Sequence, residues 1–322
     1  MNRVIIIGAG ELGSRHLQGI VRSSRPLEIT CIDLFESALI RARKRLEEIE
    51  QRHLHKVFFS SQYDNLPNEA DIAIIATNFR ERLEVMKILL DKVKVKYLIL
   101  EKVLFPKLQD YNKVWDLVGD NVMKIWVNCP RRMDPAYQQI RKDLRNNRHP
   151  ITMTVTGNSW NMGSNAIHFI DLFAFFTGDT SIDISTKSLD RKIFPSKRNG
   201  YFEFSGTMII SDQSGNTCVL HSNDGEPGSI EVSIESKVQK ITVKENEYVE
   251  VTSGDKIIKR EPHIMKFQSQ LSNIVADDLF ENGNTSLTPL SESIQIHMPL
   301  INSLMIYFNE VTGQTHSTCP IS

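Results

Sequence analysis

The first 127 residues alternate short apolar runs with longer amphipathic segments. Such alternation is typical of β-α-β units, in which covering helices join the strands of a parallel sheet. We expect helices over Leu34–Arg52, which carries charges at helical spacing, and over Arg80–Lys92, which places its leucines on one face. The strands that the pattern predicts are Arg3–Ile7, Glu28–Ile32, Val57–Ser60, Asp71–Ala76, Tyr97–Leu100 and Val122–Val127.

The pattern changes after Pro130 to a long β-rich stretch. Over Ser229–Ser236, Ile230, Val232 and Ile234 alternate with polar residues, which is typical of a sheet with one solvated face. We therefore expect an open, mainly antiparallel sheet from about residue 151 to residue 252. The other elements expected here are a strand over Ile151–Thr156 and helices over Ala166–Phe176, His263–Asn282 and Ser291–Glu310.

The two patterns together predict an α/β fold class with two domains. Residues 1–127 form a Rossmann-type parallel sheet domain, and residues 128–322 form an α+β domain with an open, mainly antiparallel sheet. A length of 322 residues fits two domains that bury their own cores. A net charge of −1, with 40% hydrophobic and 24% charged residues, argues against long disordered segments and against a general nucleic-acid binder.

Cysteine usage and hydropathy narrow the class of protein further. The four cysteines are scattered without a C-x-x-C pair, so we expect neither a metal site nor a disulfide framework. The first apolar run, Val4–Ile7, is too short for a signal peptide, and no stretch approaches the roughly 18 apolar residues of a membrane span. We expect a protein of the reducing cytoplasm with no membrane and no nucleic-acid partner.

The strongest local motif is Gly8-Ala9-Gly10-Glu11-Leu12-Gly13, directly after the first predicted strand. Gly8 allows a tight turn, Gly10 lets a pyrophosphate approach the main chain, and Gly13 permits close packing of helix against strand. The phosphates would then meet the free N–H groups at the helix start. This context predicts dinucleotide binding; the alternative is a glycine turn that only connects two elements.

Asp33 follows the last glycine of this motif by 20 residues and ends the second predicted strand. A carboxylate at this place accepts a hydrogen bond from the ribose 2′-hydroxyl and repels a 2′-phosphate, so NAD is favoured over NADP. Two alternatives stay open. Asp33 could only cap the next helix, and the nearby Arg41 and Arg43 could weaken the discrimination.

Glu101 and Lys102 end a strand of the buried type. At the carboxyl end of a parallel strand this pair faces the ligand crevice, where a lysine ammonium can polarise a carbonyl or hydroxyl oxygen. From spacing alone, the alternative of an exposed surface salt bridge is the stronger one.

Several motifs together resemble the Gfo/Idh/MocA oxidoreductases, which include glucose-fructose oxidoreductase and inositol dehydrogenase. The resemblance runs through nearly the whole chain, although each motif is short. The motifs are Gly8–His16, Ala76-Thr77-Asn78, Glu101-Lys102-Val103, Asn128–Pro135 and Ile167–Leu172.

The resemblance implies a dinucleotide domain followed by a domain whose open sheet mediates oligomer contacts, giving a homodimer or homotetramer. It also implies hydride exchange between a nicotinamide and a sugar or cyclitol carbon. The family's catalytic lysine falls on Lys102, and its characteristic histidine, which exchanges the alcohol proton, falls on His168. The residues expected at the cofactor are Gly8, Gly10, Glu11, Leu12, Gly13, Asp33, Thr77, Asn78 and Glu101.

Three departures limit the transfer of function. Val103 replaces the usual proline after the lysine, and Arg82 stands where many members have a histidine. Ser164 occupies the position, four residues before His168, where dehydrogenase members commonly place an aspartate. A serine hydroxyl is too weak an acid or base to replace that carboxylate. A rival interpretation is therefore a cofactor-binding sensor or assembly partner without dehydrogenase chemistry.

Residues for the carbohydrate substrate are expected near the domain boundary and on the His168 helix. Arg131 or Arg132 could bind an anionic substrate group, and Asn165 could bind a sugar hydroxyl. Asp171 lies three residues after His168, which on a helix indicates a shared face, and it is either a substrate contact or structural support. Trp160 could stack on a sugar or pack internally.

Overall fold

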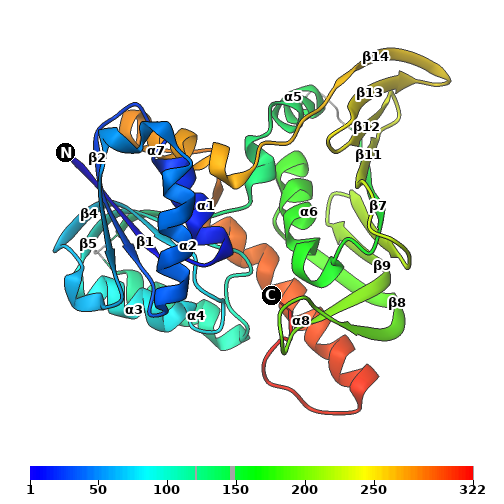
Figure 1. The fold of residues 1–322 in the computed structure, drawn as a ribbon. Helices are drawn as coiled ribbons and strands as arrows, with labels where there is room; N and C mark the ends of the chain where they lie inside the picture. Colours follow the sequence, from blue (N-terminus) through cyan, green and yellow to red (C-terminus); the bar gives the residue numbers. More distant parts are fainter. Residues whose placement is uncertain (120–121, 146–148, 322) are drawn as a thin grey trace. The chain divides into compact units, whose positions relative to one another are not determined.

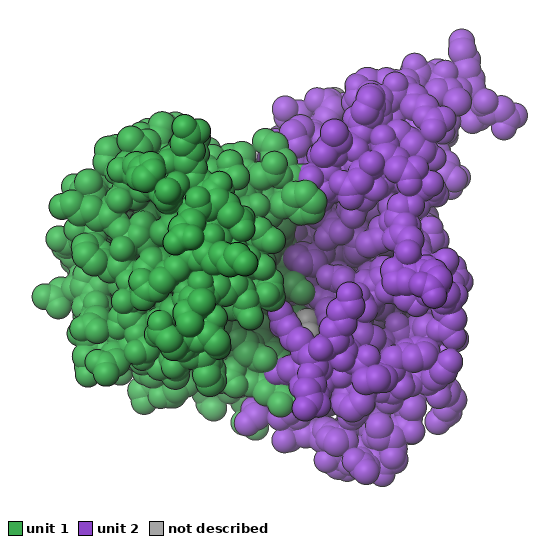
Figure 2. Space-filling view, viewed as in Figure 1, with its two compact units in different colours: residues 1–105, 109–130, 266–290 green, residues 106–108, 131–265, 291–322 purple. Residues whose placement is uncertain are grey.

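The structure is a computed structural model and describes residues 1–119, 122–145 and 149–321. It divides into two compact units. Figure 1 colours the chain by sequence position, and Figure 2 colours it by unit. Unit 1 comprises residues 1–105, 109–130 and 266–290, and unit 2 comprises residues 106–108, 131–265 and 291–322. The expected α/β class is confirmed, because unit 1 carries a mostly parallel sheet and unit 2 a mostly antiparallel one.

Unit 1 is built on a seven-stranded sheet in the order β15-β6-β5-β4-β1-β2-β3. Strands β1 to β6 are parallel, whereas β15 pairs antiparallel with β6. The chain order reverses between β1 and β4, which is the switch point where ligands bind in sheets of this type. The strands are β1 (Asn2–Ile7), β2 (Leu27–Ile32), β3 (Lys56–Ser60), β4 (Glu69–Ile75), β5 (Lys94–Leu100), β6 (Val122–Val127) and β15 (Thr288–Pro289).

The central strands are almost continuously apolar because helices cover both faces of a parallel sheet. The last four residues of β1, β4 and β5 are all buried. The helices of unit 1 are α1 (Glu11–Ile20), α2 (Glu36–Glu47), α3 (Arg82–Lys92), α4 (Leu108–Val118, all but its first residue) and α7 (Ser272–Asn282), with short 3₁₀ turns at Glu50–Leu54, Tyr63–Asn65 and Gln268–Gln270.

Unit 2 carries an eight-stranded sheet in the order β14-β13-β12-β11-β7-β10-β9-β8. Only β7 and β10 run parallel; the other neighbours are antiparallel. Figure 1 shows this sheet as a long curved surface with α6 beside it. The strands are β7 (Thr152–Asn158), β8 (Ile182–Pro195), β9 (Phe202–Asp212), β10 (Thr217–Asn223), β11 (Glu231–Glu235), β12 (Lys240–Lys244), β13 (Tyr248–Ser253) and β14 (Lys256–Pro262).

Alternation along these strands buries one face of the sheet. In β11, Val232 and Ile234 are buried while their neighbours are more exposed, as the sequence pattern predicts. The apolar helix α6 packs on the buried face against β9 and β10. The helices of unit 2 are α5 (Pro135–Leu144), α6 (Met162–Thr177) and α8 (Leu290–Thr312, all but its first residue), with a 3₁₀ turn at Pro130–Met133 at the boundary.

The structure differs from the sequence pattern in three places. The helix expected over His263–Asn282 begins only at Ser272, because the preceding residues run extended as far as the 3₁₀ turn. Residues 266–290 group with unit 1, whereas the pattern predicted a single boundary after residue 127. Helices α4 and α5 were not predicted. No helix among the residues that the structure describes has the length and apolarity to cross a membrane.

Candidate active site

The carboxyl edge of the parallel sheet brings the unit 1 motifs together. Gly8 donates its N–H to Ile32 at 2.7 Å, and Ala76 donates to Ile7 at 2.8 Å, so the loops after β1, β2 and β4 are adjacent. Glu101 continues this edge by donating its N–H to Ile75 at 3.1 Å. The glycine loop, Asp33, Thr77 and Glu101 therefore lie together at the switch point of the sheet, where sheets of this type have their ligand crevice.

The three motif glycines meet three different surroundings. Gly8 has a φ of +92°, and a Cβ there would lie 2.8 Å from the Thr77 main-chain nitrogen. A Cβ on Gly13 would lie 1.6 Å from the Gly8 carbonyl oxygen, so only glycine permits this approach of helix and strand. A Cβ on Gly10 would meet nothing within 4 Å. The main chain at Gly10 is therefore open at the start of α1, and the predicted contact with a diphosphate stays a prediction.

Asp33 is held by two main-chain donors. Its Oδ2 accepts from the Ala9 N–H at 2.7 Å and its Oδ1 from the Phe35 N–H at 2.9 Å. Helix α2 begins at Glu36 with Phe35 as its N-cap, so Asp33 ties the glycine loop to the segment before α2 rather than capping that helix. Each carboxylate oxygen retains capacity to accept a further hydrogen bond, as a ribose hydroxyl requires.

The arginines near this crevice already have partners. Arg41 lies 3.2 Å from a carboxylate oxygen of Glu11, and Arg45 lies 2.5 Å from the other. The hydrogen bond from Arg45 is the main reason that the pKa of Glu11 is lowered. Arg43 lies over the ring of Phe59 at 4.3 Å. Arg41 and Arg45 are thus paired with the same carboxylate, and Arg43 lies on an aromatic face.

Glu101 points into the interior of unit 1 rather than toward solvent. Its Oε1 lies 2.7 Å from His16 Nε2 and 2.6 Å from Asn128 Nδ2. Burial acts to raise the pKa of Glu101, but the hydrogen bonds and charge interactions from His16 and Asn128, together with nearby Arg82, outweigh it and lower the pKa. His16 is anchored on its other nitrogen by Ser272 Oγ at 3.0 Å. Glu101 therefore acts through this buried network, and its predicted contact with the cofactor stays a prediction.

Lys102 is half-buried between two buried neighbours, Glu101 and Val103, and the Lys102–Val103 peptide bond is cis. The segment after Lys102 is held by Arg82, which is only 2% exposed at the start of α3. Arg82 donates to the carbonyls of Val103 and, at 3.0 Å, Leu104, and it also reaches the Thr77 carbonyl at 2.8 Å. The two departures noted in the sequence, Arg82 and Val103, are thus in direct contact.

The second group of predicted residues lies on α6 in unit 2. This helix is buried along most of its length, but Ser164, Asn165 and His168 are only half-buried and share one face. Asn165 Nδ2 donates to the Trp160 carbonyl at 2.8 Å. Trp160 is buried, packs against Phe169 at 5.4 Å between ring centroids, and therefore has the internal packing role.

Asp171 and Arg131 have structural partners within unit 2. Asp171 is completely buried and accepts from Arg132 Nε at 2.8 Å, which favours structural support over substrate contact. Arg131 forms two hydrogen bonds with Glu245, at 2.7 and 2.9 Å, and lies over the Phe169 ring at 4.2 Å. A contact between Arg131 and an anionic substrate stays a prediction.

The sequence patterns missed a carboxylate beside the His168 helix. Glu203, on β9 and only 7% exposed, accepts hydrogen bonds from the Ser164 hydroxyl and from the Ser164 N–H, the latter at 3.2 Å. No local signal could reveal it, because Glu203 is 39 residues from Ser164 and sits in an ordinary strand sequence. The His16–Glu101 pair was missed for the same reason, although both residues belong to quoted motifs.

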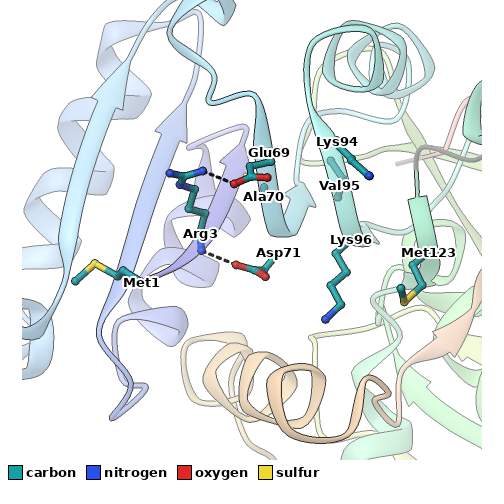
Figure 3. A pocket seen from close by; sticks show the side chains of 9 residues that line it. All are labelled: Met1, Arg3, Glu69, Ala70, Asp71, Lys94, Val95, Lys96 and Met123. Carbon is teal, nitrogen blue, oxygen red and sulfur yellow. Dashed lines mark hydrogen bonds and ion pairs between the residues drawn. The ribbon is translucent and has the colours of Figure 1, made fainter.

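A separate cavity of about 600 Å³ lies at the opposite, amino-terminal edge of the parallel sheet (Figure 3). Arg3 bonds there to Glu69 through its side chain and to Asp71 through its main-chain N–H, both at 2.9 Å. Because the glycine loop follows the other end of β1, this cavity is not the dinucleotide crevice. Its lining is Met1, Arg3, Glu69, Ala70, Asp71, Lys94, Val95, Lys96 and Met123.

Solved structures share the fold over nearly the whole chain at low sequence identity. An oxidoreductase from Agrobacterium radiobacter in complex with NAD+, L-tartaric acid and magnesium is 15% identical, with a TM-score of 0.71 and 97% of each chain covered. A putative myo-inositol dehydrogenase from Sinorhizobium meliloti 1021 is 15% identical, with a TM-score of 0.66; the match covers 94% of this chain and 97% of that chain. Biliverdin reductase from Synechocystis sp. PCC 6803, with biliverdin and NADP+, is 12% identical, with a TM-score of 0.70 and the same coverage.

No curated protein matches the chain. Residues 2–129 match a family model described as an oxidoreductase family with an NAD-binding Rossmann fold. The glycine cradle and the switch-point crevice of unit 1 agree with that description, so the resemblance seen in the sequence motifs is confirmed. The amino-terminal domain of the chain, residues 2–129, thus matches the model of the Gfo/Idh/MocA oxidoreductase family.

Proposed function

We propose that this protein is an NAD-dependent oxidoreductase that transfers a hydride between a nicotinamide and the secondary alcohol or ketone carbon of a sugar, sugar derivative or cyclitol. The observation that carries the proposal is the unit 1 crevice. It combines the open cradle at Gly10, the fixed carboxylate of Asp33 and the half-buried Lys102 along one sheet edge. The bound nicotinamide supplies the group that accepts or donates the hydride.

The side chains of this chain would bind and orient the substrate. Lys102 follows a strand end that faces the crevice, so its ammonium orients and polarises the reacting oxygen. His168 exchanges the alcohol proton, a role suited to an imidazole near neutral pH. Asn165, on the same half-buried face of α6, offers its remaining hydrogen-bonding capacity to a sugar hydroxyl.

The preference for NAD over NADP is supported by the charges around Asp33. The Ala9 and Phe35 N–H groups hold its carboxylate in place, where it repels a 2′-phosphate. Arg41 and Arg43 contact Glu11 and Phe59 instead of standing free for a phosphate. We expect Asp33→Asn to weaken NAD binding and narrow the difference between the two cofactors, measured by titration of each.

Oligomerisation through the unit 2 sheet belongs to the same proposal, as a homodimer or homotetramer. The face opposite α6 carries a row of neutral side chains across five paired strands, which suits burial against a second sheet. We expect Ile209→Asp, at the β9 end of this row, to lower the molar mass seen by light scattering. The row is Ile209, Val219, Thr154, Ser233 and Thr242.

The test of the function is a screen of sugars, nucleotide sugars and cyclitols that records nicotinamide absorbance together with NAD affinity. We expect at least one compound to reduce NAD, and Lys102→Ala to abolish this while leaving NAD affinity nearly unchanged. NAD binding without any substrate-linked absorbance change would favour the rival interpretation of a sensor or assembly partner. Failure to bind NAD at all would refute both interpretations.

A further inference from the structure

A buried carboxylate from a distant strand lies at the amino-terminal turn of α6. Glu203 accepts from both the hydroxyl and the N–H of Ser164. A Cβ added to Gly163 would lie 2.9 Å from Glu203 Oε2, so the carboxylate is pressed against the first helical turn. The free N–H groups and the dipole at a helix start favour the negatively charged form of a carboxyl group in this place.

Ser164 connects this carboxylate to the face that carries His168. The two residues are four apart on α6, and helical side chains lean toward the amino terminus, so His168 leans toward the turn of Ser164. Both side chains are half-buried on a helix that is otherwise largely buried. Position 164 is also where the sequence departs from the family pattern by lacking an aspartate.

Three arginines also contact α6: Arg141 lies over the Phe175 ring at 4.1 Å, and Arg131 and Arg132 are held in ion pairs. Arg131 is bonded to Glu245 on one side of the helix. Arg132 is bonded to Asp171, the acidic residue of α6 itself, and to Glu292 at 2.9 Å. Among these carboxylates, Glu203 is the one that accepts hydrogen bonds from Ser164 in the first turn of α6.

We propose that Glu203 supplies, from β9, the negative charge that Ser164 lacks, and that it stabilises the imidazolium form of His168. The inference rests on the proposed function of His168. During oxidation the alcohol C–H bond breaks and its electron pair leaves as hydride to the nicotinamide, while the O–H proton passes to His168 as the C=O bond forms. The proton then leaves His168 for solvent, and Glu203 stays ionised throughout, as a carboxylate that supports a catalytic histidine does.

Glu203 is a positioning residue in this scheme, because it acts on His168 through Ser164 and does not touch the substrate. The test uses the full chain with three variants: Glu203→Gln, Ser164→Asp, and both changes together. Glutamine keeps the volume and one acceptor oxygen but removes the charge. The double variant restores a carboxylate at the position where the family pattern has one, one turn before His168.

We expect Glu203→Gln to lower kcat by about tenfold to a hundredfold, with KM changed by less than about threefold. We expect the double variant to recover most of the lost kcat, which a purely structural role for Glu203 would not produce. A wild-type kcat in Glu203→Gln would overturn the proposal, as would a folded double variant that shows no recovery.

A second readout is independent of turnover. The charge on His168 is followed by imidazole nitrogen chemical shifts at pH 6.5, assigned by comparison with His168→Gln. We expect Glu203→Gln to reduce the imidazolium fraction and the double variant to restore it; an unchanged fraction would overturn the proposal even if no sugar is turned over. If Glu203→Gln does not fold, Ser164→Ala replaces it and is expected to reduce the imidazolium fraction in the same way.

Discussion

The loop that carries Lys102 depends on one buried guanidinium, and this dependence can be measured. Arg82 donates to the carbonyls of Thr77, Val103 and Leu104 and is almost wholly shielded from water. Arg82→Met keeps a long side chain but leaves these three carbonyls without their donor. The substitution therefore tests whether the arginine stabilises the loop or only fills space.

The magnitude follows from two opposing contributions. Hydrogen bonds to a charged group contribute about 1.5–3 kcal/mol each, so three of them approach roughly 4–9 kcal/mol. Removing the arginine also relieves the cost of burying its charge, which is several kcal/mol. We expect a net destabilisation of about 2–4 kcal/mol, and a loss of about tenfold to a hundredfold in kcat because Lys102 loses its orientation.

The assay is urea unfolding of unit 1, followed by tryptophan fluorescence, with hydrogen exchange of the peptide that contains residues 103–105. Arg80→Met is the matched control, since Arg80 is exposed two residues earlier and a surface change is expected to alter stability by less than about 0.5 kcal/mol. The reasoning is wrong if Arg82→Met and Arg80→Met unfold at the same urea concentration and exchange at the same rate.

Two further predictions concern unit 1, and a third concerns buried cysteines of both units. Gly10→Ala places its methyl group in open space, so it should leave the stability unchanged while weakening NAD binding at least about tenfold. Gly13→Ala should destabilise the fold, because its Cβ would lie 1.6 Å from the Gly8 carbonyl oxygen. Equal unfolding curves for the two variants would contradict this. Glu101→Gln should lower stability by about 1–3 kcal/mol at pH 7. Because the folded pKa of Glu101 is lowered from 4.5, the stability that its carboxylate adds is present above that value and is lost as pH falls through the folded pKa. The difference in unfolding free energy between wild type and variant should therefore disappear at acid pH. A difference that does not depend on pH would refute the assignment. Burial raises the pKa of Cys31 and Cys319 to about 12, so a thiol reagent at pH 8 should label them only after unfolding; rapid labelling of the native chain would be the contrary result.

The parts of the fold that follow from local pattern were predictable. The six parallel strands and the glycine turn depend on apolar runs and on spacing within about 20 residues, and each lies where the pattern places it to within a few residues. The helix over residues 263–282 was placed too early, because polar residues before Ser272 fit helical periodicity but form extended chain and a 3₁₀ turn.

The site residues also divide into those that the sequence alone could interpret and those that required the tertiary structure. Gly13, whose role is set by its neighbours in the chain, could be interpreted from sequence alone. Asp171 could not, because its burial against Arg132 depends on the packing of the Pro130–Met133 turn against α6. Glu203 could not be predicted for the same reason, because only the tertiary structure places this strand residue in hydrogen-bonding distance of Ser164.

The membership of residues 266–290 in unit 1 has a consequence for how the chain is made. Ser272 contacts His16, and Gln268 Oε1 accepts from Asn128 Nδ2 at 2.8 Å. The first unit is therefore completed by a segment that is synthesised after most of the second. A nascent chain that has released only its first 130 residues lacks these partners. The ribosome must therefore deliver nearly the whole polypeptide before the nucleotide-binding half can reach its final form, and a fragment cut at residue 130 should be less stable than the same half inside the intact protein.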